Sequence, residues 1–322
     1  MGITPLPFKP LSGPPRRQHL GLFLIVLGLC LLILGLVAPT AVIMIFDMDY
    51  DETLAFVVAI PFVVGIYGGA QLIGWGRRLR AFPAEQQLVS DQRSPVLFLR
   101  SFDDDDLLDP TPRMIPLGDM FPRRYEESLA KPLEKIGPMI SIGRPGNKLS
   151  MLGGFRLFVS DQNWKEAVEH LRKHSAAVVL MVGRTEGLWW EIESSLKSVP
   201  HQRLLFFFPF VEEPKRRQSL MQRFFGFRPA QVPLSKRAYI RMEEERQVRY
   251  QLFRERAQPL LAAELPPELG SSQFIDIDST GQIRVLPTFH PWWHLLTFAT
   301  PSVGKMIVNM QRTLQPFTWK LT

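Results

Sequence analysis

Two long uncharged segments dominate the first quarter of the chain. They run from Leu20 to Phe46 and from Leu54 to Trp75. Because about 20 apolar residues in a helix cross a bilayer core of about 30 Å, each segment predicts a membrane-spanning helix. The connection between them carries only acidic charges, at Asp47, Asp49, Asp51 and Glu52. We therefore expect an antiparallel two-helix hairpin over residues 20–80, with close helix packing at three glycines of the second segment, Gly65, Gly68 and Gly69.

Basic residues flank the outer ends of both segments. Those that precede the first segment and follow the second are Arg16, Arg17, Arg77, Arg78 and Arg80. Since loops rich in lysine and arginine stay on the cytoplasmic side, the pattern predicts two spans, cytoplasmic termini and a cytoplasmic tail over residues 1–19. A cleaved signal peptide is the alternative, but the first segment is longer than the apolar part of such peptides. We expect an integral protein of the inner or plasma membrane.

Residues 95–210 alternate between short apolar runs and helical patterns. The apolar runs are VLFLRSF from Val96, PMISIG from Pro138, SAAVVLMVG from Ser175 and RLLFFFPF from Arg203. The helical patterns cover residues 123–137, 163–174 and 185–198. Strands that alternate with helices build a parallel sheet with helices on both faces, so the expected fold class is α/β. Residues 144–160 are expected to form a long loop.

The C-terminal region, residues 211–322, breaks this alternation. It contains a charged helical segment at residues 236–258 and a hairpin pattern at residues 274–286. The apolar segment from His290 to Met310 is interrupted by proline and lysine. We therefore expect an interfacial or packing helix there, in preference to a third span.

Composition narrows the classes of partner. The chain has 322 residues, of which 46% are hydrophobic, and one cysteine, Cys30, inside the first apolar segment. A single cysteine excludes a disulfide framework and a cysteine-based metal centre. The net charge is +7, and many basic residues lie beside the apolar segments or next to acidic residues. This distribution favours the anionic surface of a lipid bilayer as the partner, and no nucleic acid is expected.

No metal site and no resident cofactor are expected. Consecutive carboxylates, such as those from Asp103 to Asp106, rarely converge on one cation, so we expect a solvated loop there. His290 and His294 have helical spacing but lack the HExxH pattern of a zinc site. The loop sequence GRPGNK lacks the spacing of a glycine-rich phosphate motif.

The segment from Pro95 to Phe210 resembles a Toll/interleukin-1 receptor (TIR) domain. The stretch VLFLRSFDDD looks like the first strand of that family, and IGRPGNK looks like the loop after its second strand. The stretch SAAVVLMVGRTEGLWWEIE looks like its third strand, followed by a helix with tryptophan and glutamate. The resemblance implies a flavodoxin-like parallel sheet. It also implies signalling or defence through self-association and, in bacterial members, often the cleavage of NAD.

The resemblance implies which residues would carry NAD cleavage. One glutamate would stabilise the cationic transition state as nicotinamide leaves, and the two candidates are Glu191 and Glu193. Glu191 lies at the edge of the apolar helix face that contains Leu188 and Ile192, whereas counting from Trp189 in the family pattern selects Glu193. NAD would be a substrate, and the residues expected to bind it are Arg100, Asp103, Gly143, Arg144 and Trp190.

Two functions therefore remain open. The first is a membrane-anchored TIR-like protein that cleaves NAD when confinement to the bilayer clusters it. The second is a non-enzymatic module that binds a protein or a nucleotide, with the C-terminal region supplying the interface. A carboxylate facing an open pocket at the carboxyl ends of the strands would favour the enzyme. A filled cleft would favour the binding module.

Overall fold

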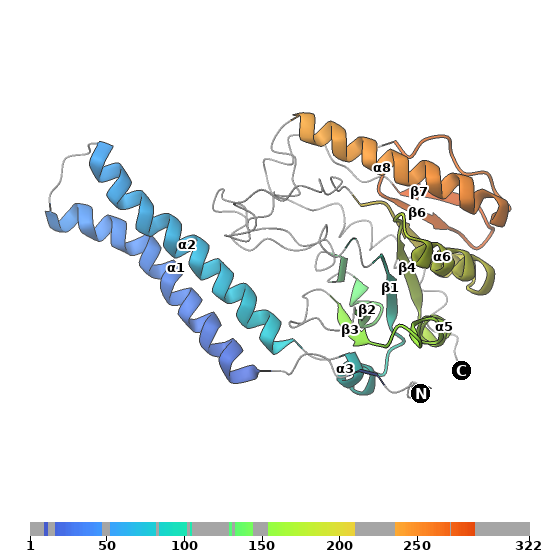
Figure 1. Cartoon of the computed structure of the whole chain (residues 1–322), viewed down its shortest axis with the longest axis horizontal. Helices are drawn as coiled ribbons and strands as arrows, with labels where there is room; N and C mark the ends of the chain where they lie inside the picture. The colour runs from blue at the N-terminus through green and yellow to red at the C-terminus, as the bar shows by residue number, and fades with distance from the viewer. Residues whose placement is uncertain are drawn as a thin grey trace.

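The computed structural model of this chain describes residues 10–11, 17–46, 52–81, 84–101, 104, 129–130, 133–143, 154–209, 236–270 and 272–286. In Figure 1 a helical hairpin stands to one side of a sheet flanked by helices. The predictions for Asp103, Arg144 and the segment from His290 to Met310 lie outside the described residues.

The hairpin consists of α1 (Gln18–Phe46) and α2 (Glu52–Arg80), which pack along glycines. The glycines that meet across the two helices are Gly21 with Gly76, Gly28 with Gly69 and Gly35 with Gly65. A Cβ atom at Gly28 would lie 2.6 Å from the carbonyl oxygen of Gly69, so only glycine permits this approach. Close packing is confirmed for Gly65 and Gly69. It is wrong for Gly68, where a Cβ atom would meet nothing within 4 Å.

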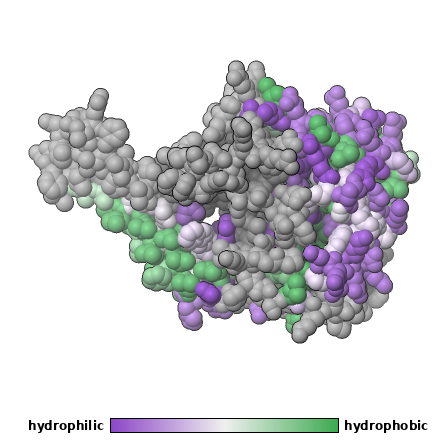
Figure 2. Space-filling model, in the orientation of Figure 1, coloured by the Kyte–Doolittle hydropathy of each residue, from purple (hydrophilic) through white to green (hydrophobic). Residues whose placement is uncertain are grey.

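Part of α1 is suited to a membrane. Within the described residues, Gln18–Ala38 is the one helical stretch that is long and apolar enough to cross a bilayer, judged by length and composition. Large apolar side chains on its outer side are exposed, among them Leu22, Phe23, Ile33, Leu34 and Val37. Figure 2 shows a hydrophobic surface along part of the hairpin. The second span and the orientation stay predictions.

A mixed seven-stranded sheet forms the centre of the remaining structure, in the order β3-β2-β1-β4-β5-β6-β7. The strands are β1 (Val96–Leu99), β2 (Met139–Gly143), β3 (Phe155–Phe158), β4 (Ala177–Met181), β5 (Leu204–Phe207), β6 (Phe274–Ile277) and β7 (Ile283–Leu286). The pairs from β3 through β5 are parallel, whereas β6 and β7 are antiparallel to their neighbours. The α/β class is thus confirmed.

Two features of the sheet differ from the sequence-based expectation. Strand β3 lies inside residues 144–160, which were predicted to be a loop, because FRLF is short and contains a charged residue. The hairpin of β6 and β7 was predicted, but it also joins the main sheet through β5. The sheet therefore has an additional strand at one edge and an antiparallel extension at the other.

Helices cover both faces of the sheet, with most of the described ones on one face. That face packs against α3 (Ala84–Ser90), α5 (Trp164–His174), α6 (Glu186–Ser198) and α8 (Lys236–Ala257). Strand side chains such as Leu97, Val178 and Phe206 are buried there. The opposite face packs Phe98 and Val179 against the segment that contains Leu129 and Leu133. At the carboxyl ends of the parallel strands, α8 contacts the residues that follow β1 and β4.

Candidate functional site

The strand order reverses between β1 and β4. From β1 the chain continues to β2 and β3 on one side, and β4 and β5 lie on the other side. In open α/β sheets, ligands bind outside the carboxyl ends of the strands at such a switch point. Here the residues at these ends are Ser101 and Asp104 after β1, and Val182 to Thr185 after β4. This is the position at which a binding site is expected.

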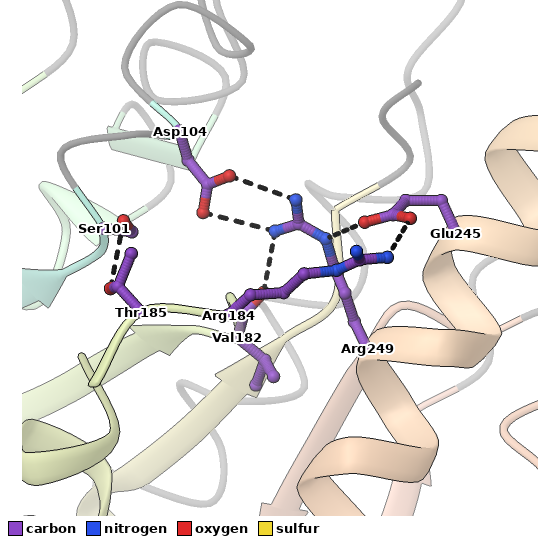
Figure 3. A network of polar contacts seen from close by, with 7 residues as sticks. All are labelled: Ser101, Asp104, Val182, Arg184, Thr185, Glu245 and Arg249. Carbon is purple, nitrogen blue, oxygen red and sulfur yellow. Dashed lines mark hydrogen bonds and ion pairs between the residues drawn. The ribbon is translucent and has the colours of Figure 1, made fainter. Parts of the chain in front are cut away.

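Arg249 of α8 occupies the switch point (Figure 3). Its two terminal nitrogens donate hydrogen bonds to the two carboxylate oxygens of Asp104, at 3.0 and 3.2 Å. One of them also donates to the carbonyl oxygen of Val182, at 3.1 Å. The side chains of Arg249 and Asp104 are 4% and 7% exposed, so the pair is buried. A two-point ion pair of this kind fixes both position and orientation.

Two further charged groups complete the cluster. Glu245, one helical turn before Arg249, accepts a hydrogen bond from Arg249 Nε at 3.0 Å. The other carboxylate oxygen of Glu245 accepts from Arg184, which follows β4. Burial opposes the ionisation of Arg249, but Asp104 and Glu245 outweigh it and raise the pKa of Arg249 above its ordinary value. Among the described residues, the two carboxylates and the two guanidinium groups of this cluster balance in charge.

Gly183 makes room for Asp104. A Cβ atom at Gly183 would lie 2.7 Å from a carboxylate oxygen of Asp104 and 3.0 Å from a methyl carbon of Leu188. Beside it, the Thr185 hydroxyl donates to the Ser101 hydroxyl at 3.1 Å and ties the two strand ends together. The described side chains at this switch point therefore contact one another closely.

Glu191 is buried in α6. The residue is 8% exposed and lies beside the buried Leu188 and Ile192, whereas the sequence placed it only at the edge of this apolar face. Burial raises the pKa of Glu191 to about 8, against the opposing charges of Arg100 and Arg172. Within the described part of the chain, its Oε2 atom has no hydrogen-bond partner. The structure thus brings two predicted site residues, Arg100 and Glu191, into electrostatic contact, and adds Arg172 of α5.

Glu193 has a different environment. Its side chain is 38% exposed and lies 3.4 Å from Arg256 of α8. Arg256 also pairs with Glu186 at 2.9 Å, and its guanidinium carbon lies 4.5 Å from the centre of the Trp189 ring. Glu193 therefore belongs to a surface ion-pair group that joins α6 and α8.

Trp190 and Gly143 have packing contacts of their own. Trp190 packs edge-on against Trp164 with ring centres 5.0 Å apart, and the Lys165 ammonium lies 5.1 Å from the Trp190 ring centre. A Cβ atom at Gly143 would lie 2.8 Å from the ring of Phe158, so glycine permits contact between β2 and β3. These contacts give both residues structural roles.

Sequence reasoning missed the residues at the centre of the switch point. Asp104 was considered only as part of a solvated acidic run, whereas its carboxylate is buried and paired. Glu245 and Arg249 have the spacing of a helical ion pair, which is a detectable signal. Their contact with Asp104 has no such local signal. Among the described residues, no group of three or more histidine, cysteine, aspartate or glutamate side chains is placed to hold a metal ion.

Comparisons with known proteins give no relative from which to carry over a function. No protein-family model matches this chain, and neither a curated protein nor a solved structure does.

Proposed function

We propose that this protein is a membrane-anchored α/β module that acts by binding a partner protein and not by cleaving NAD. The observation that carries the proposal is the buried contact of Arg249 with Asp104 at the switch point. A nucleotide at this position would have to displace a charge-balanced cluster whose side chains already satisfy one another. Breaking a buried ion pair leaves uncompensated charge and costs about 3–5 kcal/mol.

The state of the two glutamates supports binding over catalysis. A carboxylate stabilises a cationic transition state only when it is ionised and reaches the reacting atoms. Glu191 is 8% exposed, and its pKa of about 8 leaves it mostly neutral at pH 7. Glu193 is more exposed, but Arg256 already pairs with it. Neither environment suits the role that the TIR resemblance implies.

The TIR-like assignment is part of the proposal. When β3 is set aside, the parallel strands follow the order β2-β1-β4-β5, which matches the first four strands of the flavodoxin-like order. Helices α5 and α6 lie before and after β4, as that arrangement requires. A flavodoxin-like core with an additional edge strand accounts for this topology. Self-association of such domains would be favoured by their confinement to a bilayer.

The membrane anchor consists of α1 and α2 in this proposal, with both termini in the cytoplasm. Support comes from the apolar stretch Gln18–Ala38 and from the glycine contacts that hold α2 against it. The arginines at the ends of the hairpin favour a cytoplasmic location for that end. The α/β domain follows α2 directly and would lie on the same side.

A second candidate function, NAD cleavage, is favoured by one observation. Arg100 and Glu191 are both predicted site residues, and the charge of Arg100 acts on the Glu191 carboxyl. In an assembled state that exposed Glu191, the arginine would lower the pKa of the carboxyl and favour its ionised form. This function requires a rearrangement of α6 relative to the strand ends.

The test is NAD consumption by the full-length protein, reconstituted at high density in liposomes to promote assembly. We expect no loss of NAD above that of empty liposomes. Glu191→Ala and Glu193→Ala serve as the informative variants, and Glu166→Ala, at an exposed position of α5, is the matched control. Turnover by the wild type that Glu191→Ala or Glu193→Ala abolishes, while Glu166→Ala retains it, would replace the binding function with the enzymatic one.

A further inference from the structure

The two ends of the hairpin that lead into the rest of the chain meet at one place. The amide of Arg17, directly before α1, donates to the carbonyl oxygen of Leu79 in the last turn of α2, at 2.9 Å. That last turn carries Arg77, Arg78 and Arg80. We call this group of four arginines, Arg17, Arg77, Arg78 and Arg80, the basic base of the hairpin. Arg17, Arg77 and Arg80 are exposed to solvent.

Close helix contact brings the charges of both helices together. A Cβ atom at Gly21 would lie 2.6 Å from the carbonyl oxygen of Gly76 and 2.6 Å from Cγ of Arg80. The aliphatic part of Arg80 therefore lies against α1, although the residue belongs to α2. Positive charge from two helices is thus concentrated on one small surface.

An exposed apolar surface begins directly beside the basic base. Leu20 and Leu22 of α1 are 43% and 50% exposed, and Trp75 of α2 is 51% exposed. A boundary between exposed apolar and basic side chains is typical of the level at which lipid phosphates lie. Arginine suits this position because its planar group offers several donors to phosphate oxygens.

We propose that the basic base binds the headgroup phosphates of anionic phospholipids in the membrane. This inference rests on the proposed membrane anchor. It names phospholipids with a net negative headgroup, such as phosphatidylglycerol, because a zwitterionic headgroup carries its own cation and has no net attraction to an arginine cluster. The hydrogen bond from the Leu11 amide to the Phe158 carbonyl oxygen, at 2.7 Å, joins the segment before the hairpin to β3.

Tryptophan quenching tests this inference on the full-length protein. The protein is reconstituted in phosphatidylcholine bilayers that contain a fraction of brominated lipid. In one set the brominated lipid is phosphatidylglycerol, and in the other it is phosphatidylcholine. Brominated acyl chains quench tryptophan at short range. The difference between wild type and Trp75→Phe isolates the signal of Trp75. We expect phosphatidylglycerol to be preferred over phosphatidylcholine about tenfold at the position of Trp75, as judged by quenching. In the variant Arg17→Gln/Arg77→Gln/Arg80→Gln this preference should fall close to one.

Two further variants separate local charge from general effects. Arg203→Gln/Arg241→Gln/Arg254→Gln removes the same charge from the α/β domain and should retain the preference. Arg17→Lys/Arg77→Lys/Arg80→Lys should retain most of it, because the charge remains. Equal quenching by both lipids in the wild type, or a preference that survives in the glutamine variant, overturns the lipid inference and leaves the anchor intact. Absence of quenching by either lipid overturns the anchor as well.

Discussion

Arg249 and Asp104 are 145 positions apart in the sequence and form a buried two-point ion pair at the carboxyl ends of β1 and β4. The pair joins α8 to the strand end at which open α/β sheets usually bind their ligands. Its burial, together with the bond from Arg249 to Glu245, makes the cluster part of the folded core.

Replacing Arg249 by alanine should destabilise the α/β domain by about 3–5 kcal/mol, because it leaves the carboxylates of Asp104 and Glu245 buried without their partner. Guanidinium chloride unfolding, followed by tryptophan fluorescence, measures the change. Arg254→Ala is the matched control on the same helix. Arg254 lies 3.9 Å from a Glu264 side chain that is 85% exposed, so its loss should cost less than about 1 kcal/mol. Equal losses of unfolding free energy for the two substitutions would show that the buried pair stabilises the domain no more than the exposed pair does.

Gly183→Ala should displace the carboxylate of Asp104. The added Cβ atom would lie 2.7 Å from a carboxylate oxygen, and overpacking of this kind costs about 1–3 kcal/mol. In an Asp104→Ala background the same substitution should cost clearly less, since the displaced group is gone. A double-mutant cycle on unfolding free energies measures this coupling. Additive effects would contradict the predicted contact.

The stability of the domain should fall between about pH 4.5 and pH 8 through Glu191. The ordinary pKa of the carboxyl is 4.5, and burial raises it to about 8 in the folded state. Between these values the folded protein binds the proton more tightly than the unfolded chain does, so raising the pH favours unfolding. One proton contributes at most about 1.4 kcal/mol per pH unit.

The variant Glu191→Gln tests this dependence because glutamine resembles the protonated carboxyl. Unfolding free energies of the wild type and of this variant are compared from pH 5 to pH 8. The variant should lose less stability over this range, and its advantage should grow with pH. Parallel curves would mean that Glu191 does not titrate within this range in the folded protein.

The hairpin should depend on glycine at the contact positions only. Gly28→Val would place side-chain atoms where the Gly69 carbonyl oxygen now lies, 2.6 Å from the Cβ position, and should separate α1 from α2. The expected destabilisation is about 1–3 kcal/mol. Unfolding in sodium dodecyl sulfate, followed by the distance between labels on the two helices, measures it. Gly68→Val is the control, because a Cβ atom there meets nothing within 4 Å.

The sequence predicts the fold class because its strands β1, β4 and β5 are continuous apolar runs with clear helical patterns between them. Strand β3 was not predicted because its four residues include an arginine, Arg156, and so form no continuous apolar run. Its place in the sheet comes from pairing with β2, which is a long-range contact. The helical period placed Glu191 only at the edge of the apolar face of α6, whereas the structure buries it.

The switch-point cluster was not predictable from the sequence. Helix α8 is rich in charged residues, and composition alone suggests a solvated helix. Arg246, Arg249 and Tyr250 are nevertheless buried, because the helix packs against the sheet between β5 and β6. Which of its arginines meets Asp104 depends on the packing of elements far apart in the chain. Local patterns do not contain this information.

Chemical labelling of a cysteine at Ser101 tests the central claim most directly. Ser101 is 4% exposed, and its hydroxyl accepts a hydrogen bond from the Thr185 hydroxyl at the switch point. In a Cys30→Ser background, Ser101→Cys should react slowly with a small hydrophilic thiol reagent, and NAD should leave the rate unchanged. Ser198→Cys, at an exposed position of α6, should react rapidly and serves as the control. Rapid labelling of the Ser101→Cys variant that NAD suppresses would show an open nucleotide site and contradict the account.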